Sequence, residues 1–298
     1  MLSRRDWLAA ACAGLPLGAT LPSLAQAQPQ PTPRRVVAVG GALTETVYAL
    51  GAQADLVGVD TTSLYPAAAQ QLPSVGYARS LSAEGVLSLK PTLIIASGEA
   101  GPPAVLRQLQ GAGVPLVTLD AEHRAEQVWE RTQRLGTLLG REAAGGALAA
   151  RLQREWQAAM ARVQVLQAPA TNRRPPRVLF VLSHAMNQVR IAGRDTAADA
   201  MIRYAGATNA LGEVAGFKPL TPEAAIAAAP DLILGTEQGL AAAGGIDGLL
   251  AAPGLAATPA GRARRVVALE AMFLLGFGPR LPQAVVQLAE ALHGPARG

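Results

Sequence analysis

The chain has 298 residues, of which 50% are hydrophobic and 16% are charged, so it has enough apolar material for one large domain or two modest ones. Its formal net charge is +5, but the arginines that carry this charge are scattered and few aromatic residues lie between them, which argues against nucleic-acid binding. The single cysteine, Cys12, lies near the N-terminus, so the rest of the chain has no disulfide bond and no cysteine-based metal site.

Residues 1–27 are predicted to be an export signal and not a part of the fold. The twin-arginine pair Arg4-Arg5 precedes an apolar stretch, and Ala25-Gln26-Ala27 fits the pattern of a cleavage site. Glycines and prolines interrupt the apolar stretch, which makes it a poor membrane span. Export by the twin-arginine route predicts a periplasmic protein, and a lipoprotein acylated at Cys12 is the alternative.

After this signal, short apolar strands alternate with helices, a pattern that predicts a parallel sheet covered on both faces. Strands are expected at residues 36–39, 56–59, 92–96 and 114–119. Helices are expected from Thr44 to Leu50, from Ser82 to Pro91, from Pro103 to Gln110 and over residues 128–139. A polar loop runs from Asp60 to Pro66 and carries Tyr65 near its tip.

The stretch from Glu142 to Gln167 is predicted to be one long amphipathic helix. It contains no proline, and its apolar residues recur at steps of three and four. At 1.5 Å per residue the helix would be about 39 Å long, roughly the diameter of a small domain. We therefore interpret it as a connection between two lobes, with an ordinary surface helix as the alternative.

The chain beyond this helix repeats the pattern that precedes it. Strands are expected at 178–182, 231–234 and 265–269, and helices at 197–204, where Thr196 would be the cap, and at 281–292. Three pairs of residues correspond at a spacing of about 140 residues: Arg35 with Arg177, Glu84 with Glu223, and Pro91 with Pro230. The sequence therefore predicts two copies of one α/β unit joined by the long helix.

Motifs of common enzyme classes are missing from the sequence. It has no GxSxG, P-loop or HExxH motif, and Gly40-Gly41 lacks the spacing of a dinucleotide-binding fingerprint. The three histidines are too far apart in sequence to form a metal-binding run. Two lobes, a connecting helix and an export signal favour a binding protein whose ligand lies between the lobes at the carboxyl ends of the strands. A periplasmic two-lobed enzyme is the alternative.

The segment VGGALTETVYALG and the paired segments ending in KPTLIIA and APDLILG resemble helix-hinged periplasmic substrate-binding proteins, which serve ABC importers of cobalamin, siderophores and haem. Further stretches are similar to the haem branch: Tyr65-Pro66, Gly76 to Gly85, Gly101-Pro102-Pro103, Ala192 to Asp199 and Gly216 to Leu220. The resemblance implies an α/β fold of two Rossmann-like lobes with parallel sheets and a ligand cleft between them. The expected limits are 34–121 for the first lobe, 122–170 for the connecting and hinge helices and 176–298 for the second lobe.

This resemblance implies that the protein captures haem and delivers it to an ABC haem importer, and is not an enzyme. Related cobalamin carriers also have a Tyr-Pro pair in the same loop, so a cobalamin or ferric-siderophore carrier is the alternative. The implied partners are the permease dimer, its ATPase and an outer-membrane haem receptor system upstream. We expect a monomer.

The resemblance places the axial ligand of ferric haem b at Tyr65, and a tyrosine oxygen is a known ligand of ferric haem. Lys218 would supply a cation that helps to hold this oxygen as an anion, with a solvated loop lysine as the alternative. Arg79 and Arg194 match propionates in bidentate geometry, although both could equally be solvated. His184 is the candidate ligand of a second haem, since some relatives hold two, and a structural loop histidine is the alternative.

Glu84 and Glu223 occupy the same place in the two copies, near the start of a helix. There a carboxylate is favoured by the helix dipole, and this role alone would explain both residues. The resemblance implies a further role, in which each glutamate docks on an arginine of one permease subunit.

Overall fold

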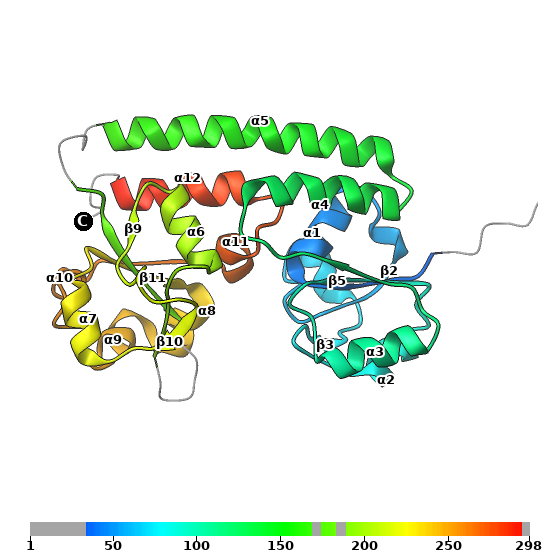
Figure 1. Cartoon of the computed structure of the whole chain (residues 1–298), viewed down its shortest axis with the longest axis horizontal. Helices are drawn as coiled ribbons and strands as arrows, with labels where there is room; N and C mark the ends of the chain where they lie inside the picture. The colour runs from blue at the N-terminus through cyan, green and yellow to red at the C-terminus, as the bar shows by residue number, and fades with distance from the viewer. Residues whose placement is uncertain (1–33, 169–173, 183–188, 294–298) are drawn as a thin grey trace, which may run out of the picture. The chain divides into compact units, whose positions relative to one another are not determined.

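The computed structural model describes residues 34–168, 174–182 and 189–293, which form two main sheets and a set of covering helices (Figure 1). The predicted export signal and Cys12 lie outside the described residues. No helix in the described part is both long and apolar enough to cross a membrane.

The first sheet is parallel, with the strand order β2-β1-β5-β6. Its strands are β1 (Val36–Val39), β2 (Leu56–Val59), β5 (Leu93–Ser97) and β6 (Leu116–Leu119). Its helices are α1 (Gly41–Ala49), α2 (Ala83–Ser88) and α3 (Pro103–Gly111). All four residues of β1 are buried, as expected for a central strand covered on both faces. The predicted parallel sheet is confirmed, and a short hairpin of β3 (Gly76–Tyr77) and β4 (Ser80–Leu81) is an unpredicted addition.

Helix α1 begins at Gly41, three residues earlier than predicted, and the prediction that Thr44 caps it is wrong. The cap residue is Gly40, whose φ of 122° is a backbone conformation that favours glycine. Thr44 lies buried within the helix, where its hydroxyl bonds the hydroxyl of Ser63 at 2.7 Å. The carboxylate of Asp60 accepts a hydrogen bond from the Gly40 amide at 2.9 Å. The loop after β2 therefore sets the start of α1.

The second sheet is mixed, with the order β10-β8-β7-β11-β12 and β9 beside β7. Its strands are β7 (Arg177–Leu182), β8 (Arg190–Ala192), β9 (Thr208–Asn209), β10 (Phe217–Pro219), β11 (Leu232–Thr236) and β12 (Val266–Leu269). Strands β7, β9, β11 and β12 are parallel, but β8 runs antiparallel to both β7 and β10. The expectation of a purely parallel second sheet is therefore wrong at this edge, because strands of three residues carry too few alternating positions to be recognised.

Helices around the second sheet are mostly short. They are α6 (Ala197–Tyr204), α7 (Pro222–Ala228), α8 (Glu237–Ala242), α9 (Gly245–Leu250), α10 (Pro259–Arg262) and α11 (Ala271–Leu275). The predicted cap of α6 is confirmed, since the Thr196 side chain accepts a hydrogen bond from the Asp199 amide.

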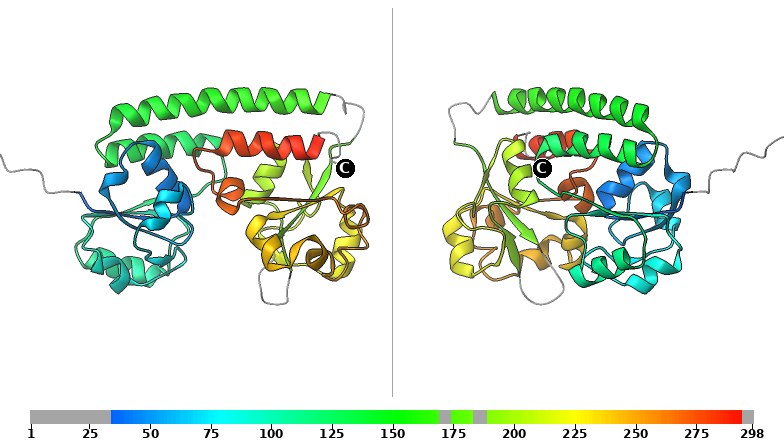
Figure 2. Two further views of the ribbon diagram at one scale, coloured as in Figure 1. Left: turned by 180° about the vertical axis from the view of Figure 1, so that it is seen from behind. Right: turned by 45° about the vertical axis from the view of Figure 1, so that its right-hand side comes forward.

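The predicted long helix is α5 (Glu142–Gln167), and its bounds are those expected. Helix α4 (Ala125–Leu138) and helix α12 (Leu281–His293) both pack against it, as Figures 1 and 2 show. The α5 residues that are buried recur on one face over most of its length: Gly145, Leu148, Ala149, Leu152, Ala159 and Val163. The connection between the two sheets is therefore a layer of three helices, with α5 as its longest member.

The two copies share a specific side-chain contact besides their sequence similarity. Arg35 precedes β1, and its side chain donates hydrogen bonds to the carbonyls of Leu89 and Lys90 at the end of α2. Arg177 opens β7 and donates to the carbonyl of Ala228 at the end of α7 at 3.0 Å. A cation is favourable at the C-terminus of a helix, where the carbonyls lack partners. Equivalent arginines thus cap the C-terminus of the corresponding helix in the two copies.

Candidate functional site

Tyr65 lies in the loop that follows β2, and 47% of its surface is exposed. The base of this loop is rigid because the buried Asp60 carboxylate binds several groups at once. It accepts hydrogen bonds from the Gly40 amide at 2.9 Å, the Thr62 hydroxyl at 2.7 Å and the Ser63 hydroxyl at 3.0 Å. An exposed phenol is therefore held on a loop with a fixed, buried anchor.

A guanidinium group covers one face of the Tyr65 ring. The Cζ atom of Arg280 lies 3.9 Å from the ring centroid, within the range of a cation–π interaction. The same guanidinium lies 5.1 Å from the centroid of the Phe273 ring. The sequence assigned no role to Arg280, and it is Arg280 that faces Tyr65.

Two carboxylates hold the Arg280 side chain. One of its terminal nitrogens lies 2.9 Å from Oε2 of Glu45, and its Nε donates to the same oxygen at 3.0 Å. The Glu270 carboxylate is 3.5 Å away. Glu45 belongs to α1 beside the first sheet, whereas Glu270 is the cap residue of α11 beside the second. Arg280 therefore links elements from both halves of the chain.

Burial shifts the ionisation of this cluster. It raises the pKa of the Glu45 carboxyl, and this effect outweighs the opposing influence of Arg280. Burial also lowers the pKa of Arg280, but the hydrogen bond and charge of Glu45, with the charge of Glu270, raise it further than burial lowers it. Within the described residues, the buried Oε1 atom of Glu45 has no hydrogen-bond partner. Glu45 therefore depends on Arg280 for the stability of its charge.

A second group of polar side chains lies near the carboxyl ends of β5 and β6. Arg79 pairs with Glu99 at 2.7 Å, and both side chains are about half exposed. The hydrogen bond that Arg79 donates to Glu99 is the main cause that raises the pKa of Arg79. His123 packs edge-on against the ring of Phe277, with 5.4 Å between the centroids. Burial lowers the pKa of His123, and the charge of Glu99 opposes this effect.

Arg131 of α4 holds the turn that carries Arg280. It is buried, and it donates hydrogen bonds to the carbonyls of Asp120 and Phe277. Burial lowers its pKa to about 10. A Cβ atom on Gly278 would lie 3.5 Å from Ala42 of α1, so the turn also packs directly on that helix. The turn over residues 276–280 is thus fixed to α1 and α4.

The remaining predicted ligand-binding residues make contacts with other residues or lie outside the described part. Lys218 is exposed on β10, where its backbone pairs with Ile191 of β8. Arg194 is exposed, forms an ion pair with Asp195 at 3.5 Å and donates to the carbonyl of Glu213. His184 lies outside the described residues.

Glu84 and Glu223 are both exposed and occupy equivalent positions at the starts of α2 and α7. Each follows a helix cap at the same distance. The Ser82 side chain accepts a hydrogen bond from the Gly85 amide, and the Thr221 side chain accepts one from the Ala224 amide. The two carboxylates are therefore presented to solvent from matching helix starts.

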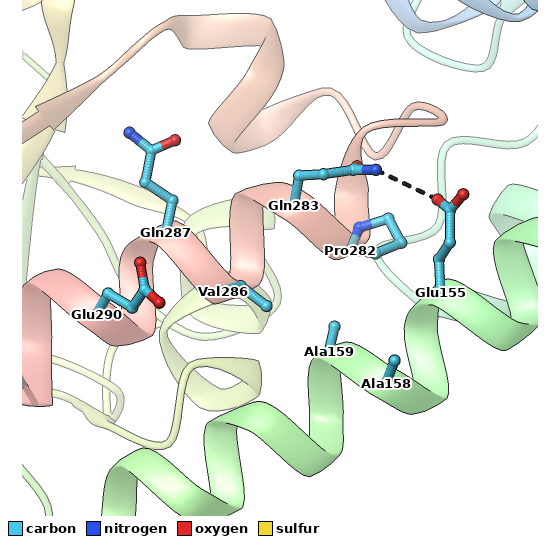
Figure 3. Close-up of a pocket in the computed structure, with 8 residues that line it drawn as sticks. All are labelled: Glu155, Ala158, Ala159, Pro282, Gln283, Val286, Gln287 and Glu290. Atoms are coloured by element: carbon cyan, nitrogen blue, oxygen red, sulfur yellow. Dashed lines mark hydrogen bonds between the residues drawn. The ribbon is translucent and has the colours of Figure 1, made fainter.

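A separate groove of about 650 Å³ lies between α5 and α12 (Figure 3). It is lined by Glu155, Ala158, Ala159, Pro282, Gln283, Val286, Gln287 and Glu290. The Gln283 amide donates to the Glu155 carboxylate across it at 3.2 Å. Its lining has no aromatic ring, and none of the predicted site residues belongs to it. In the described part of the chain, no three His, Cys, Asp or Glu side chains are placed to hold a metal ion.

Comparison with known proteins gives one family and several close structures. Residues 36–272 match the family described as "Periplasmic binding protein". The structure of the periplasmic heme-binding protein BhuT in complex with two hemes is 53% identical, with a TM-score of 0.81, over 87% of this chain and 98% of that chain. The periplasmic heme-binding protein RhuT from Roseiflexus sp. RS-1 in apo form is 42% identical, with a TM-score of 0.84, over 88% of this chain and 98% of that chain.

A curated relative extends the comparison to another cargo. The cobalamin-binding protein of Halobacterium salinarum is 28% identical over 274 residues, which are 88% of this chain and 70% of that protein. The matching family covers most of the present chain, and the matched structures share its two α/β lobes and the long helix α5. The chain therefore belongs to the periplasmic binding protein family.

Proposed function

We propose that this protein captures haem and delivers it to an ABC-type haem importer. The observation that carries the proposal is the geometry at Tyr65, an exposed phenol on an anchored loop with a guanidinium over its ring. The likeness to two heme-binding proteins, one of them with two hemes bound, supports the same cargo. The proposed role is that of a carrier and not of an enzyme.

Tyr65 is the proposed axial ligand of ferric haem. Ferric iron is a hard cation, and tyrosine oxygen is one of the axial ligands that proteins use for haem iron. Arg280 occupies one face of the ring, and the hydroxyl at the edge of this partly exposed side chain is the group proposed to meet the iron.

Other side chains are proposed to bind the remainder of the haem. Arg79 and Arg194 are proposed partners of the propionates, and each already has a carboxylate beside it, Glu99 and Asp195 respectively. A propionate would therefore exchange with an existing ion pair on an exposed surface, at a modest cost. Lys218 remains a proposed cation of the site, and His184 the proposed ligand of a second haem.

The proposed setting is the periplasm, with export by the twin-arginine route. The proposed monomer carries ferric haem b and passes this cargo to a permease dimer driven by an ATPase. An outer-membrane haem receptor system would supply the cargo upstream. A cobalamin carrier is the second candidate, because the Halobacterium salinarum relative is named for cobalamin binding.

An absorption titration tests the cargo directly. Protein that begins at residue 28 is titrated in parallel with hemin, cyanocobalamin and a ferric hydroxamate siderophore. Hemin should give an intense Soret band that saturates at one or two equivalents, and the other two ligands should not saturate in the same range. Saturation by cyanocobalamin or the siderophore, without saturation by hemin, would reject the proposal. The His184→Ala variant decides the stoichiometry, because loss of the second equivalent would assign that ligand.

A further inference from the structure

Arg280 is held more firmly than an exposed arginine usually is. Its side chain is only 23% exposed; its Nε donates a hydrogen bond to Oε2 of Glu45 at 3.0 Å, and a terminal nitrogen forms an ion pair with the same oxygen at 2.9 Å. Arg280 is the last residue of the turn over residues 276–280, which Arg131 and the packing of Gly278 fix in place. The guanidinium over Tyr65 is therefore positioned by its contacts with the buried Glu45 and by the fixed turn.

The carboxylates of Glu270 and Glu45, which both lie beside Arg280, bind different partners. The Glu270 carboxylate already accepts hydrogen bonds from the amides of Met272 and Phe273, at 2.8 and 2.7 Å, and so caps α11. Its distance to Arg280 is the longer one, 3.5 Å. Glu45 makes its hydrogen bond to Arg280, and its side chain is only 7% exposed. Leaving a carboxylate buried without its cation is costly, so Glu45 holds Arg280 strongly.

We propose that Arg280 is a further residue of the cargo site and that Glu45 is the residue that positions it, so that Tyr65 meets haem iron beside a fixed positive charge. This inference rests on the proposed haem-binding function and adds two residues to it. Arg280 acts on the ligand tyrosine by contact with its ring. Glu45 acts only through Arg280.

The proposal has a distinctive electrostatic consequence. A positive charge near the iron favours the ferrous over the ferric state, so losing Arg280 should shift the midpoint potential of the bound haem to a more negative value. Losing the negative charge of Glu45 would, by itself, shift the potential to a more positive value. If Glu45 acts by holding Arg280, its loss releases the guanidinium from Tyr65, and the potential shifts to a more negative value instead.

The geometry can be tested first in the protein without haem. The chain has four tyrosines, so protein labelled with 3-fluorotyrosine should give four fluorine NMR signals, and the Tyr65→Phe variant identifies the signal of Tyr65. Arg280→Gln and Glu45→Met should both move this signal in the same direction. Arg162→Gln is the control, because Arg162 forms an ion pair with Glu290 at 3.1 Å on the α5–α12 side, and it should leave the signal in place.

Two outcomes of this experiment would overturn the proposal. If Arg280→Gln does not move the Tyr65 signal, Arg280 does not cover the ring in solution. If Arg280→Gln moves it and Glu45→Met does not, Glu45 does not position the guanidinium. Glu45→Gln keeps the shape of the side chain and serves as the second variant if Glu45→Met does not fold, and it should give a smaller shift in the same direction.

The second measurement is the midpoint potential of the haem-loaded protein. Both Arg280→Gln and Glu45→Met should shift it to more negative values, and Arg162→Gln should leave it unchanged. A positive shift for Glu45→Met would show that Glu45 acts through its own charge, which contradicts the positioning role. If the wild-type protein takes up no hemin, the proposed function fails, while the fluorine measurement still decides the arrangement of Glu45, Arg280 and Tyr65.

Discussion

Gly136 of α4 and Gly145 of α5 pack backbone against backbone. A Cβ atom on Gly136 would lie 2.9 Å from the Cα atom of Gly145, and one on Gly145 would lie 3.0 Å from the Cα atom of Gly136. Contacts this short leave no space for a methyl group on either residue. The close approach of α4 and α5 therefore depends on two glycines that face each other.

The first prediction concerns this helix contact. Gly136→Ala should lower the free energy of unfolding by about 1–3 kcal/mol, because the added methyl group forces two packed helices apart. Urea denaturation measures the change. Gly146→Ala is the matched control, since Gly146 lies in α5 next to Gly145 but a Cβ atom there meets nothing within 4 Å. It should stabilise the protein by about 0.5–1 kcal/mol, because alanine favours a helix interior. Equal effects of the two changes would contradict the close contact.

The second prediction concerns the haem ligand. Tyr65→Phe keeps the ring beneath Arg280 but removes the oxygen, so the absorption bands of a ferric tyrosinate complex should disappear. Haem affinity should fall by at least about tenfold, which corresponds to about 1.4 kcal/mol. Tyr77→Phe is the control, because Tyr77 is exposed to the same extent, 47%, and should keep both the spectrum and the affinity. An unchanged spectrum for Tyr65→Phe would remove Tyr65 as the ligand.

The third prediction is a pH dependence that comes from His123. Burial lowers the pKa of this imidazole in the folded protein, whereas the unfolded chain takes up the proton near pH 6.5. The contribution of His123 to stability is therefore fully present above about pH 6.5 and is lost as the pH falls from there towards the lowered pKa. His123→Asn should lose stability less steeply than wild type over this range. Urea denaturation at several pH values measures the difference, and parallel curves would contradict it.

The fourth prediction concerns the permease. Glu84→Ala and Glu223→Ala should leave haem binding intact and reduce ATP-driven uptake in reconstituted vesicles, with a larger reduction in the double variant. Paired charges on two lobes fix the orientation of an encounter more than they add affinity. Glu237→Ala is a suitable control, because Glu237 is also exposed in the first turn of a short helix, α8. Wild-type uptake by the double variant would exclude docking through these residues, and lost haem binding would place them in the cargo site.

Much of the fold follows from short-range patterns in the sequence. The bounds of α5 and α6 were predicted to the residue, because a helix of regular amphipathic spacing or with a threonine cap is specified by its own residues. The buried strands β1 and β2 were also predicted with their observed bounds. These elements have in common that neighbours in sequence determine them.

Two of the misses, the start of α1 and the role of Arg280, have a common physical cause in contacts between distant residues. Helix α1 begins at Gly41 because the carboxylate of Asp60, from the loop after β2, binds the Gly40 amide. The pairing of Arg280 with Glu45 joins residues 235 positions apart, so no local sequence pattern predicts it. The sequence identified a loop tyrosine as the candidate ligand, but the cation that covers it came from a glycine-rich turn.

Helix α5 also sets a rotational phase between the two ends of the helical layer. It packs against α4 near Gly145 and against α12 near Glu155. The directions in which these two contacts face are therefore fixed by the number of α5 residues between them. Each residue turns an α-helix by about 100°, so one residue inserted between these two contacts would rotate one end by about 100° relative to the other. That rotation would carry Arg280, which directly precedes α12, away from Glu45. Seven inserted residues would restore the phase to within about 20° while lengthening the helix by about 10 Å. The number of residues in α5, counted in whole helical turns, therefore helps to decide whether the guanidinium of Arg280 lies over the ring of Tyr65.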